Sequence, residues 1–121
     1  MDLSKFKAVD SIRVDIDQAG CEGVAFILAG PSHPATKKAE RARTDAMANN
    51  KRRLKGDALK QMVTEFLAAR VLSWEGVEWD GKPLEASEEN ALLILGNPDL
   101  EFIQNQLLTA LGNDDLFYKS N

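Results

Sequence analysis

Few residues in this chain of 121 could support covalent or acid–base chemistry, and the first pair to consider is Cys21 and His33. Cys21 lies in a glycine-rich segment, and His33 follows twelve residues later in a proline-flanked loop. A cysteine nucleophile needs a base within hydrogen-bond distance, and no spacing signature in the sequence favours such a contact. We therefore interpret His33 as a loop histidine that is solvated or bonded to its neighbours.

Metal binding has equally little support in the sequence. One histidine and one cysteine do not make a zinc site. The carboxylates of Asp15, Asp17 and Glu22 could lie near one another, but their pattern is typical of a solvent-facing strand edge. No glycine-rich phosphate-binding motif is present. The sequence predicts no catalytic residue, no metal ion and no cofactor, and therefore a protein that is not an enzyme.

A basic tract is the remaining feature that could bind a charged ligand. Residues 37–60 contain nine basic and three acidic side chains, whereas residues 71–121 contain two basic and ten acidic ones. Such an asymmetry can serve intramolecular packing, head-to-tail self-association or a charged partner. Lys51-Arg52-Arg53-Leu54-Lys55 could neutralise phosphates, but no aromatic residue lies between Phe26 and Phe66 to stack on bases. A solvated helix face or a contact with an acidic protein surface is favoured over nucleic-acid binding.

Length and composition are those of an ordinary globular domain. The chain is long enough for one domain with its own core, over residues 1–121. A single cysteine excludes an internal disulfide. No apolar run approaches the ~18 residues that span a membrane, and the N-terminus lacks the apolar segment of a secretory signal. We expect a cytosolic protein with no membrane contact.

Two strands are predicted near the N-terminus. Residues 11–17 alternate between apolar and polar side chains, the period of a strand with one buried face. Residues 24–29 are continuously apolar, as in a more deeply buried strand. The glycine-rich loop between them predicts an antiparallel β-hairpin over 11–29, which must pack on other elements to be stable.

A basic helix is predicted next, over residues 34–55. Pro34 suits the first helical turn, with Ser32 or His33 near the cap. Alanine, lysine, arginine and glutamate favour a helix here, but its apolar face consists mostly of alanine. We expect a long, exposed or partly mobile helix that becomes ordered with a partner.

A helical unit is predicted over residues 57–112. Asp57 can cap a helix whose apolar positions run from Leu59 to Val71 at amphipathic spacing. Asp80-Gly81 predicts a tight turn. Ser87 predicts the cap of a helix over 88–95, which Gly96 should end with positive φ.

The C-terminal end of the chain should contain one more helix and a tail. Asn97-Pro98 predicts the start of a helix that runs to Leu111. We expect residues 113–121 to form a polar tail that either folds back or binds elsewhere. The predicted fold class is α+β, with the N-terminal β-hairpin packed on a mainly helical C-terminal part.

The residues that we expect to contact a partner are the basic side chains of the 34–55 helix and the two tryptophans. Tryptophan buries a large area but keeps one N–H to satisfy, so it suits seams between elements as well as interfaces; ordinary burial is the favoured interpretation for this pair. The candidates are Lys37, Lys38, Arg41, Lys51, Arg52, Arg53, Trp74 and Trp79.

The order of phrases in residues 59–118 resembles the tail assembly chaperone family of long-tailed bacteriophages. An amphipathic helix ends in Val71-Leu72-Ser73-Trp74-Glu75-Gly76-Val77. A turn and a proline follow in Asp80-Gly81-Lys82-Pro83-Leu84, and then Ser87-Glu88-Glu89-Asn90-Ala91 before the closing helices.

This resemblance implies a non-enzymatic function in the cytoplasm of a host cell. Members of that family hold the tape measure protein until tail tube subunits polymerise around it, and they are absent from the mature virion. The implied partners are therefore the tape measure protein, the tail tube protein as a second candidate, and further copies of the chain. Two alternatives stay open: a structural tube or minor tail protein of the virion, and a small nucleic-acid-binding regulator.

Overall fold

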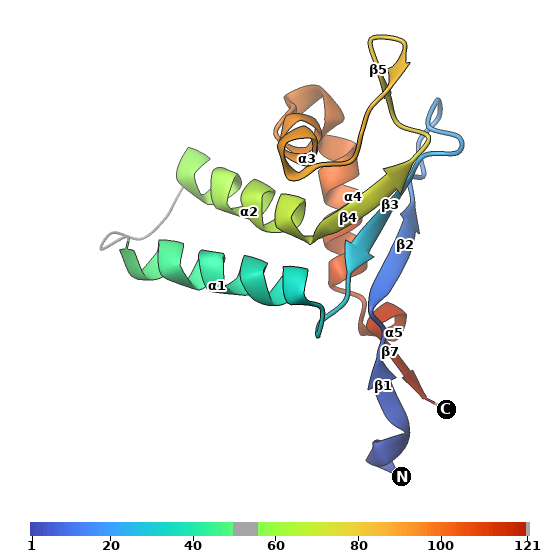
Figure 1. The fold of residues 1–121 in the computed structure, drawn as a ribbon, viewed down its shortest axis with the longest axis vertical. Helices are drawn as coiled ribbons and strands as arrows, with labels where there is room; N and C mark the ends of the chain where they lie inside the picture. The colour runs from blue at the N-terminus through green and yellow to red at the C-terminus, as the bar shows by residue number, and fades with distance from the viewer. Residues whose placement is uncertain (50–55, 121) are drawn as a thin grey trace.

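The fold is a three-stranded antiparallel sheet with helices packed on one side of it (Figure 1). The computed structural model describes residues 1–49 and 56–120. Strands β2 (Ser11–Asp15), β3 (Ala25–Ala29) and β4 (Val71–Glu75) lie in the order β2-β3-β4. This mixture of strands and helices confirms the predicted α+β class.

The predicted N-terminal hairpin is present. β2 and β3 pair antiparallel, from Ser11 opposite Ala29 to Asp15 opposite Ala25. Ile12 and Ile16 are buried on the inner face. Since β3 is the central strand, its continuously apolar sequence matches its burial.

The sequence does not predict the third strand, because it favours residues 71–75 as the end of the preceding helix. Helix α2 (Asp57–Arg70) stops at Arg70, and β4 follows without a loop and pairs antiparallel with β3. Without β4, one edge of the buried strand β3 would leave its backbone groups unpaired, which is costly. Pairing across more than forty residues therefore overrides local helix propensity at this point.

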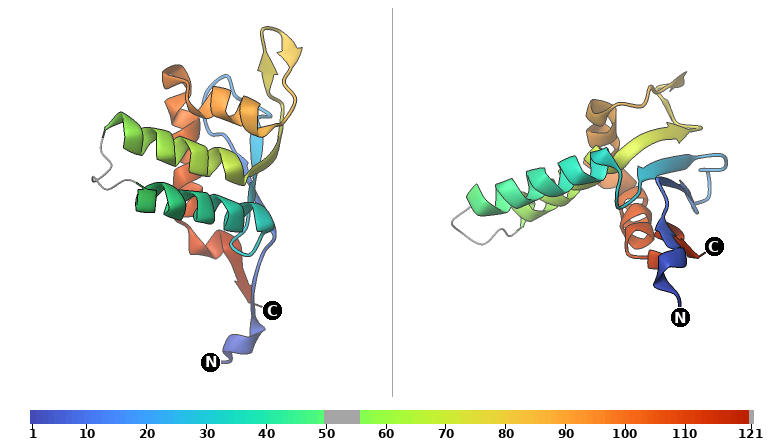
Figure 2. Two further views of the ribbon diagram at one scale, coloured as in Figure 1. Left: turned by 60° about the vertical axis from the view of Figure 1, so that its left-hand side comes forward. Right: turned by 60° about the horizontal axis from the view of Figure 1, so that its bottom comes forward.

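Helix α1 (Pro34–Asn49) lies alongside α2, and the two project together from the sheet (Figures 1 and 2). His33 Nδ1 accepts a hydrogen bond from the Ala35 N–H at 2.9 Å and so caps the first turn, as expected. Thr36 and Ala39 are buried. Small side chains thus suffice to dock α1 close to α2, although most of its surface is exposed as the sequence predicted.

Two of the predicted helix boundaries need correction. Asp57 is the first residue of α2 and not its cap; Gly56 precedes the helix and provides no side-chain hydrogen bond. Gly96 ends α3 (Glu88–Leu95) with φ −86°, in the right-handed region. Its N–H donates to the Leu92 and Ile94 carbonyls. The backbone therefore stays in the right-handed helical region, and the helix ends without positive φ.

The remaining local signals are confirmed. Ser87 Oγ accepts from the Asn90 N–H and caps α3, and Asn97 Oδ1 accepts from the Asp99 N–H. The latter begins the 3-10 helix η2 (Pro98–Leu100), which leads into α4 (Glu101–Leu111). Between β5 (Glu78–Trp79) and β6 (Lys82–Pro83), both turn residues have positive φ, as in a type I′ turn.

The C-terminal residues fold back onto the N-terminus, which the sequence left open. Helix α5 (Asp114–Phe117) buries Phe117, which is 3% exposed. Strand β7 (Tyr118–Ser120) then pairs with β1 (Phe6–Ala8), which follows the 3-10 helix η1 (Leu3–Lys5). The resulting two-stranded ribbon extends away from the other elements (Figures 1 and 2).

The core lies between the inner face of the sheet and helices α2, α3 and α4. Its largest fully buried apolar side chains come from all of these elements: Phe26, Leu28, Leu67, Ile94 and Leu107. The predicted helical unit 57–112 therefore contributes three helices, α2, α3 and α4, and also the strand β4 to the core.

Candidate partner-binding grooves

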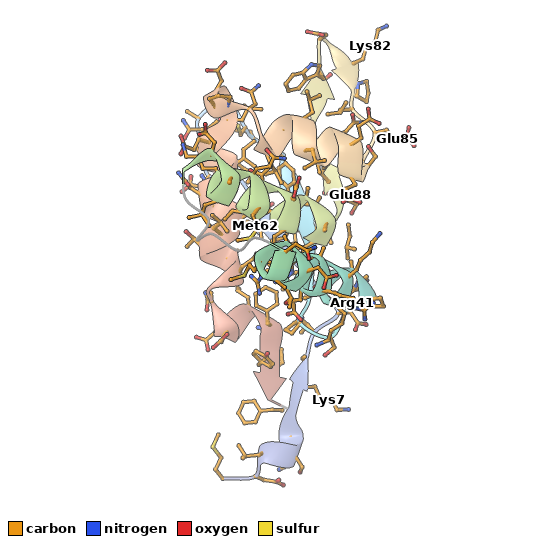
Figure 3. The ribbon with its side chains drawn as sticks, turned by 90° about the vertical axis from the view of Figure 1, so that its left-hand side faces the viewer. Lys7, Arg41, Met62, Lys82, Glu85 and Glu88 are labelled. Atoms are coloured by element: carbon orange, nitrogen blue, oxygen red, sulfur yellow. The ribbon has the colours of Figure 1, made fainter. Side chains whose placement is uncertain are left out.

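The basic face predicted for α1 is present over the residues that the structure describes. Lys37, Lys38 and Arg41 are exposed, and Figure 3 shows Arg41 on α1, below α2 and α3. Lys37 Nζ lies 4.0 Å from Glu40 Oε2, an exposed pair that contributes little to stability. Lys51, Arg52 and Arg53 lie outside the described residues.

A groove with a volume of about 250 Å³ separates α1 from α2 and α3. We call it the α3-side groove. Its floor is apolar, its α1 wall carries Lys38 and Arg43, and its opposite wall carries Glu65 and Glu88. Figure 3 looks toward this part of the molecule and labels Met62 on α2 and Glu88 on α3. The lining residues are Lys38, Ala39, Ala42, Arg43, Ala46, Met62, Glu65, Phe66, Ala69, Glu88 and Leu92.

The groove follows from the alanines of α1. A longer side chain at Ala42 would cover the half-buried Met62 and Phe66 of α2, whereas a methyl group leaves them accessible. A partner helix with an apolar stripe and charges of both signs beside it fits an apolar floor between two walls of opposite charge. The groove can therefore bind a helix through both burial and charge.

Trp74 is a core residue and not a contact residue, which corrects its place among the candidates. It is 9% exposed, and its ring meets Phe26 edge-on with centroids 5.7 Å apart. Its Nε1 donates to the Leu84 carbonyl at 2.8 Å. Because β4 is a strand, Trp74 points into the core and its one polar group is satisfied internally.

Trp79 stays a candidate for partner contact. It is half-buried in the β5–β6 hairpin and lines a cavity of about 280 Å³. Cys21, Val77 and Phe102 share this cavity, so its walls are largely apolar. The cavity offers a place for one apolar side chain of a partner.

The residues considered for catalysis are not brought together. Cys21 lies in the loop before β3, and His33 lies beyond the other end of that strand (Figure 1). Asp15 forms an ion pair with Arg13 at 3.2 Å. In residues 1–49 and 56–120, no group of three or more histidine, cysteine or acidic side chains could hold a metal ion. No helix within those ranges has the length and apolar character needed to span a membrane.

The sequence does not distinguish several of the lining residues. It predicts Met62 and Phe66 as part of the core stripe of their helix, and Arg43 is one of nine basic residues in the tract. An arginine spaced to reach an aromatic residue of a neighbouring helix is a usable signal only once the helices are known to pack. Arg43 lies over the Phe66 ring, 4.2 Å from its centroid.

Comparison with known proteins gives no relative: no family model, curated protein or solved structure matches this chain.

Proposed function

We propose that this protein is a tail assembly chaperone of a long-tailed bacteriophage that holds the tape measure protein in the host cytoplasm. It binds without catalysis, self-associates along its client and leaves before the virion is mature. The tail tube protein is a second candidate partner.

The observation that carries the proposal is the α3-side groove beside the exposed basic face of α1. A tape measure protein is long and helical, so it presents repeated amphipathic faces that aggregate unless they are covered. A groove with an apolar floor and two walls of opposite charge suits reversible contact with such faces. The phrase order in residues 71–91 that resembles the chaperone family adds support from the sequence.

The test is co-expression with the tape measure protein of the same phage. We expect the client to become soluble and to co-purify with the wild-type chain. Ala42→Trp fills the groove and should abolish both effects. Thr44→Trp is the matched control, since Thr44 is exposed on α1 and does not line the groove. A wild-type chain that neither rescues nor co-purifies with the client would refute the proposal.

A second measurement separates the chaperone from a structural tail protein. Mass spectrometry of purified particles should find tube subunits and no copy of this chain. Stoichiometric presence of the chain in particles would assign it to the virion. Retention of DNA at physiological ionic strength, lost in Lys37→Gln/Lys38→Gln/Arg41→Gln, would instead favour a nucleic-acid-binding regulator.

A further inference from the structure

Arg70, at the end of α2, is a buried cation without a matching anion. The residue is only 8% exposed. Nη2 donates to the Ala29 carbonyl at 2.6 Å, whereas the buried Nε has no hydrogen-bond partner among the described residues. No carboxylate of those residues lies within ion-pair distance of it. A buried guanidinium in this state is costly and is usually paired.

Arg70 lines a cavity of about 400 Å³ between α1, α2 and α4, on the other side of the α1–α2 seam from the α3-side groove. We call it the α4-side cavity. This volume lies within the range of about 300–1,000 Å³ that is usual for ligand sites. Its apolar lining residues are Met62, Val63, Phe66, Leu108 and Leu111, and Leu108 is 38% exposed.

A second guanidinium reaches the same cavity from α1. Arg43 and Arg70 both lie near the Phe66 ring, with their Cζ atoms 4.2 and 5.7 Å from its centroid. The Arg70 Cζ is also 5.8 Å from the centroid of Phe117. The aromatic rings hold the two cations beside the cavity without neutralising them.

Among the residues that the structure describes, Glu40 is the one carboxylate that lines this cavity, and it does not balance the two arginines. Burial is the main cause that lowers the pKa of Arg70 below its ordinary value; Glu40 opposes this effect, and Arg43 adds to it. Two cations and one anion leave an excess of one positive charge. The site is therefore complementary to a ligand with a single negative charge.

We propose that the α4-side cavity binds a carboxylate that is carried by an apolar segment of a partner protein, such as a glutamate flanked by leucines. The carboxylate accepts hydrogen bonds from Arg43 and Arg70, and the flanking side chains cover Phe66 and Leu108. A glutamate neutralises the excess charge, whereas a doubly charged phosphate would exceed it and lose its hydration to apolar walls.

The test uses the full chain, labelled with ¹⁵N, and two short helical peptides of alanine, leucine and glutamine. One peptide carries a single central glutamate, and the other has glutamine in its place. We expect saturable binding of the glutamate peptide with a shift of the Arg70 Nε–Hε resonance. The glutamine peptide should bind about tenfold more weakly or worse, because a charge-assisted hydrogen bond is lost.

Three variants test the site. Arg43→Gln should weaken binding of the glutamate peptide about tenfold. Glu40→Gln should strengthen it, because the competing carboxylate is gone; Glu40 lines the α4-side cavity and not the α3-side groove, so this variant locates the effect in the cavity. Lys7→Gln removes the same charge from an exposed position on β1, outside the cavity and the α3-side groove, and should leave the affinity unchanged. All three positions are exposed or half-exposed, so each variant should fold.

The remaining outcomes overturn the proposal. Equal binding of both peptides, or binding of neither, excludes a carboxylate site. Saturation by acetate or inorganic phosphate in the same concentration range, with the same shift of Arg70, assigns the cavity to a free anion. The inference does not depend on the proposed function: the titration tests the ligand chemistry, and rescue of the tape measure protein tests the identity of the client.

Discussion

At the residue scale, the two tryptophans show that the same residue type can either stabilise the core or stay accessible to a partner. Trp74 fills the core against Phe26 and bonds to the Leu84 carbonyl, which joins β4 to the segment before α3. Trp79 lies only five residues later in the sequence, yet it is half-exposed beside an apolar cavity. The difference arises because Trp74 lies on the inner face of the sheet, whereas Trp79 lies in a hairpin outside the sheet and packs against the core from its edge.

Two glycines with similar φ values make a residue-scale prediction. Gly76 has φ +72° and a Cβ there would overlap the carbonyl oxygen of Gly23, whereas Gly81 has φ +80° and open space around it. Gly76→Ala therefore combines left-handed strain with a backbone clash and should lower the free energy of unfolding by more than about 2 kcal/mol.

Gly81→Ala is the matched control for that change. It carries the left-handed strain alone and should cost about 1 kcal/mol. Urea denaturation followed by circular dichroism measures both values. Equal losses for the two variants would mean that the loop containing Gly23 yields and that its close approach to Gly76 is not structurally important.

At the element scale, the chain termini depend on each other. β1 pairs only with β7 among the described strands, and an isolated two-stranded ribbon is marginally stable. Phe6 and Tyr118 are exposed on this ribbon, so little apolar burial supports it. The ribbon is thus only weakly held.

Truncation of the chain after Phe117 should free β1 while leaving the core intact. The amides of residues 6–8 should lose their protection from hydrogen exchange, since their partner strand is gone. Amides of β3 and α4 should keep theirs, because Phe117 and the bond from the Val9 N–H to its carbonyl remain. Loss of protection in β3 would contradict this view and make β7 part of the core folding unit.

At the scale of the whole molecule, charge is separated along the surface. α1 presents Lys37, Lys38 and Arg41, whereas Glu85 precedes α3 and Glu88 begins it, across the α3-side groove from α1 and above α2 in Figure 3. The β5–β6 hairpin adds Glu78 and Asp80 to the acidic end. Two copies arranged head to tail would bring the opposite charges together.

We therefore expect self-association that weakens as salt increases. Sedimentation velocity should show larger species at about 20 mM NaCl than at about 500 mM, where screening acts over a few ångströms. Lys37→Gln/Lys38→Gln/Arg41→Gln should abolish the larger species at low salt. Lys5→Gln/Lys7→Gln/Lys119→Gln removes the same charge from η1 and the terminal ribbon and serves as the control. Association that persists in high salt would indicate an apolar interface instead.

Much of the fold was predictable because its signals are local. The alternation at 11–17, the cap at Ser87 and the Asn97-Pro98 start each depend on residues a few positions apart. The basic face of α1 was likewise readable from composition. These features require no knowledge of which distant segments meet.

Other features could not be predicted, because they depend on contacts between distant segments. Val71 to Glu75 form a strand only because β3 has a free edge, and Tyr118 to Ser120 form one only because β1 lies alongside. The α4-side cavity requires Arg43 and Arg70 from two different helices. Whether an arginine is paired or isolated is decided by such packing.

The sequence by itself determined where most helices begin, how the first hairpin pairs and that the charges are segregated, since chain stereochemistry and composition act over short range. Only the tertiary structure decided that Trp74 is internal, that α1 leaves a groove above Met62 and Phe66, and that Arg70 is buried without an anion. Burial is the physical reason, because the exposure of a side chain depends on the segments that pack over it from elsewhere in the chain.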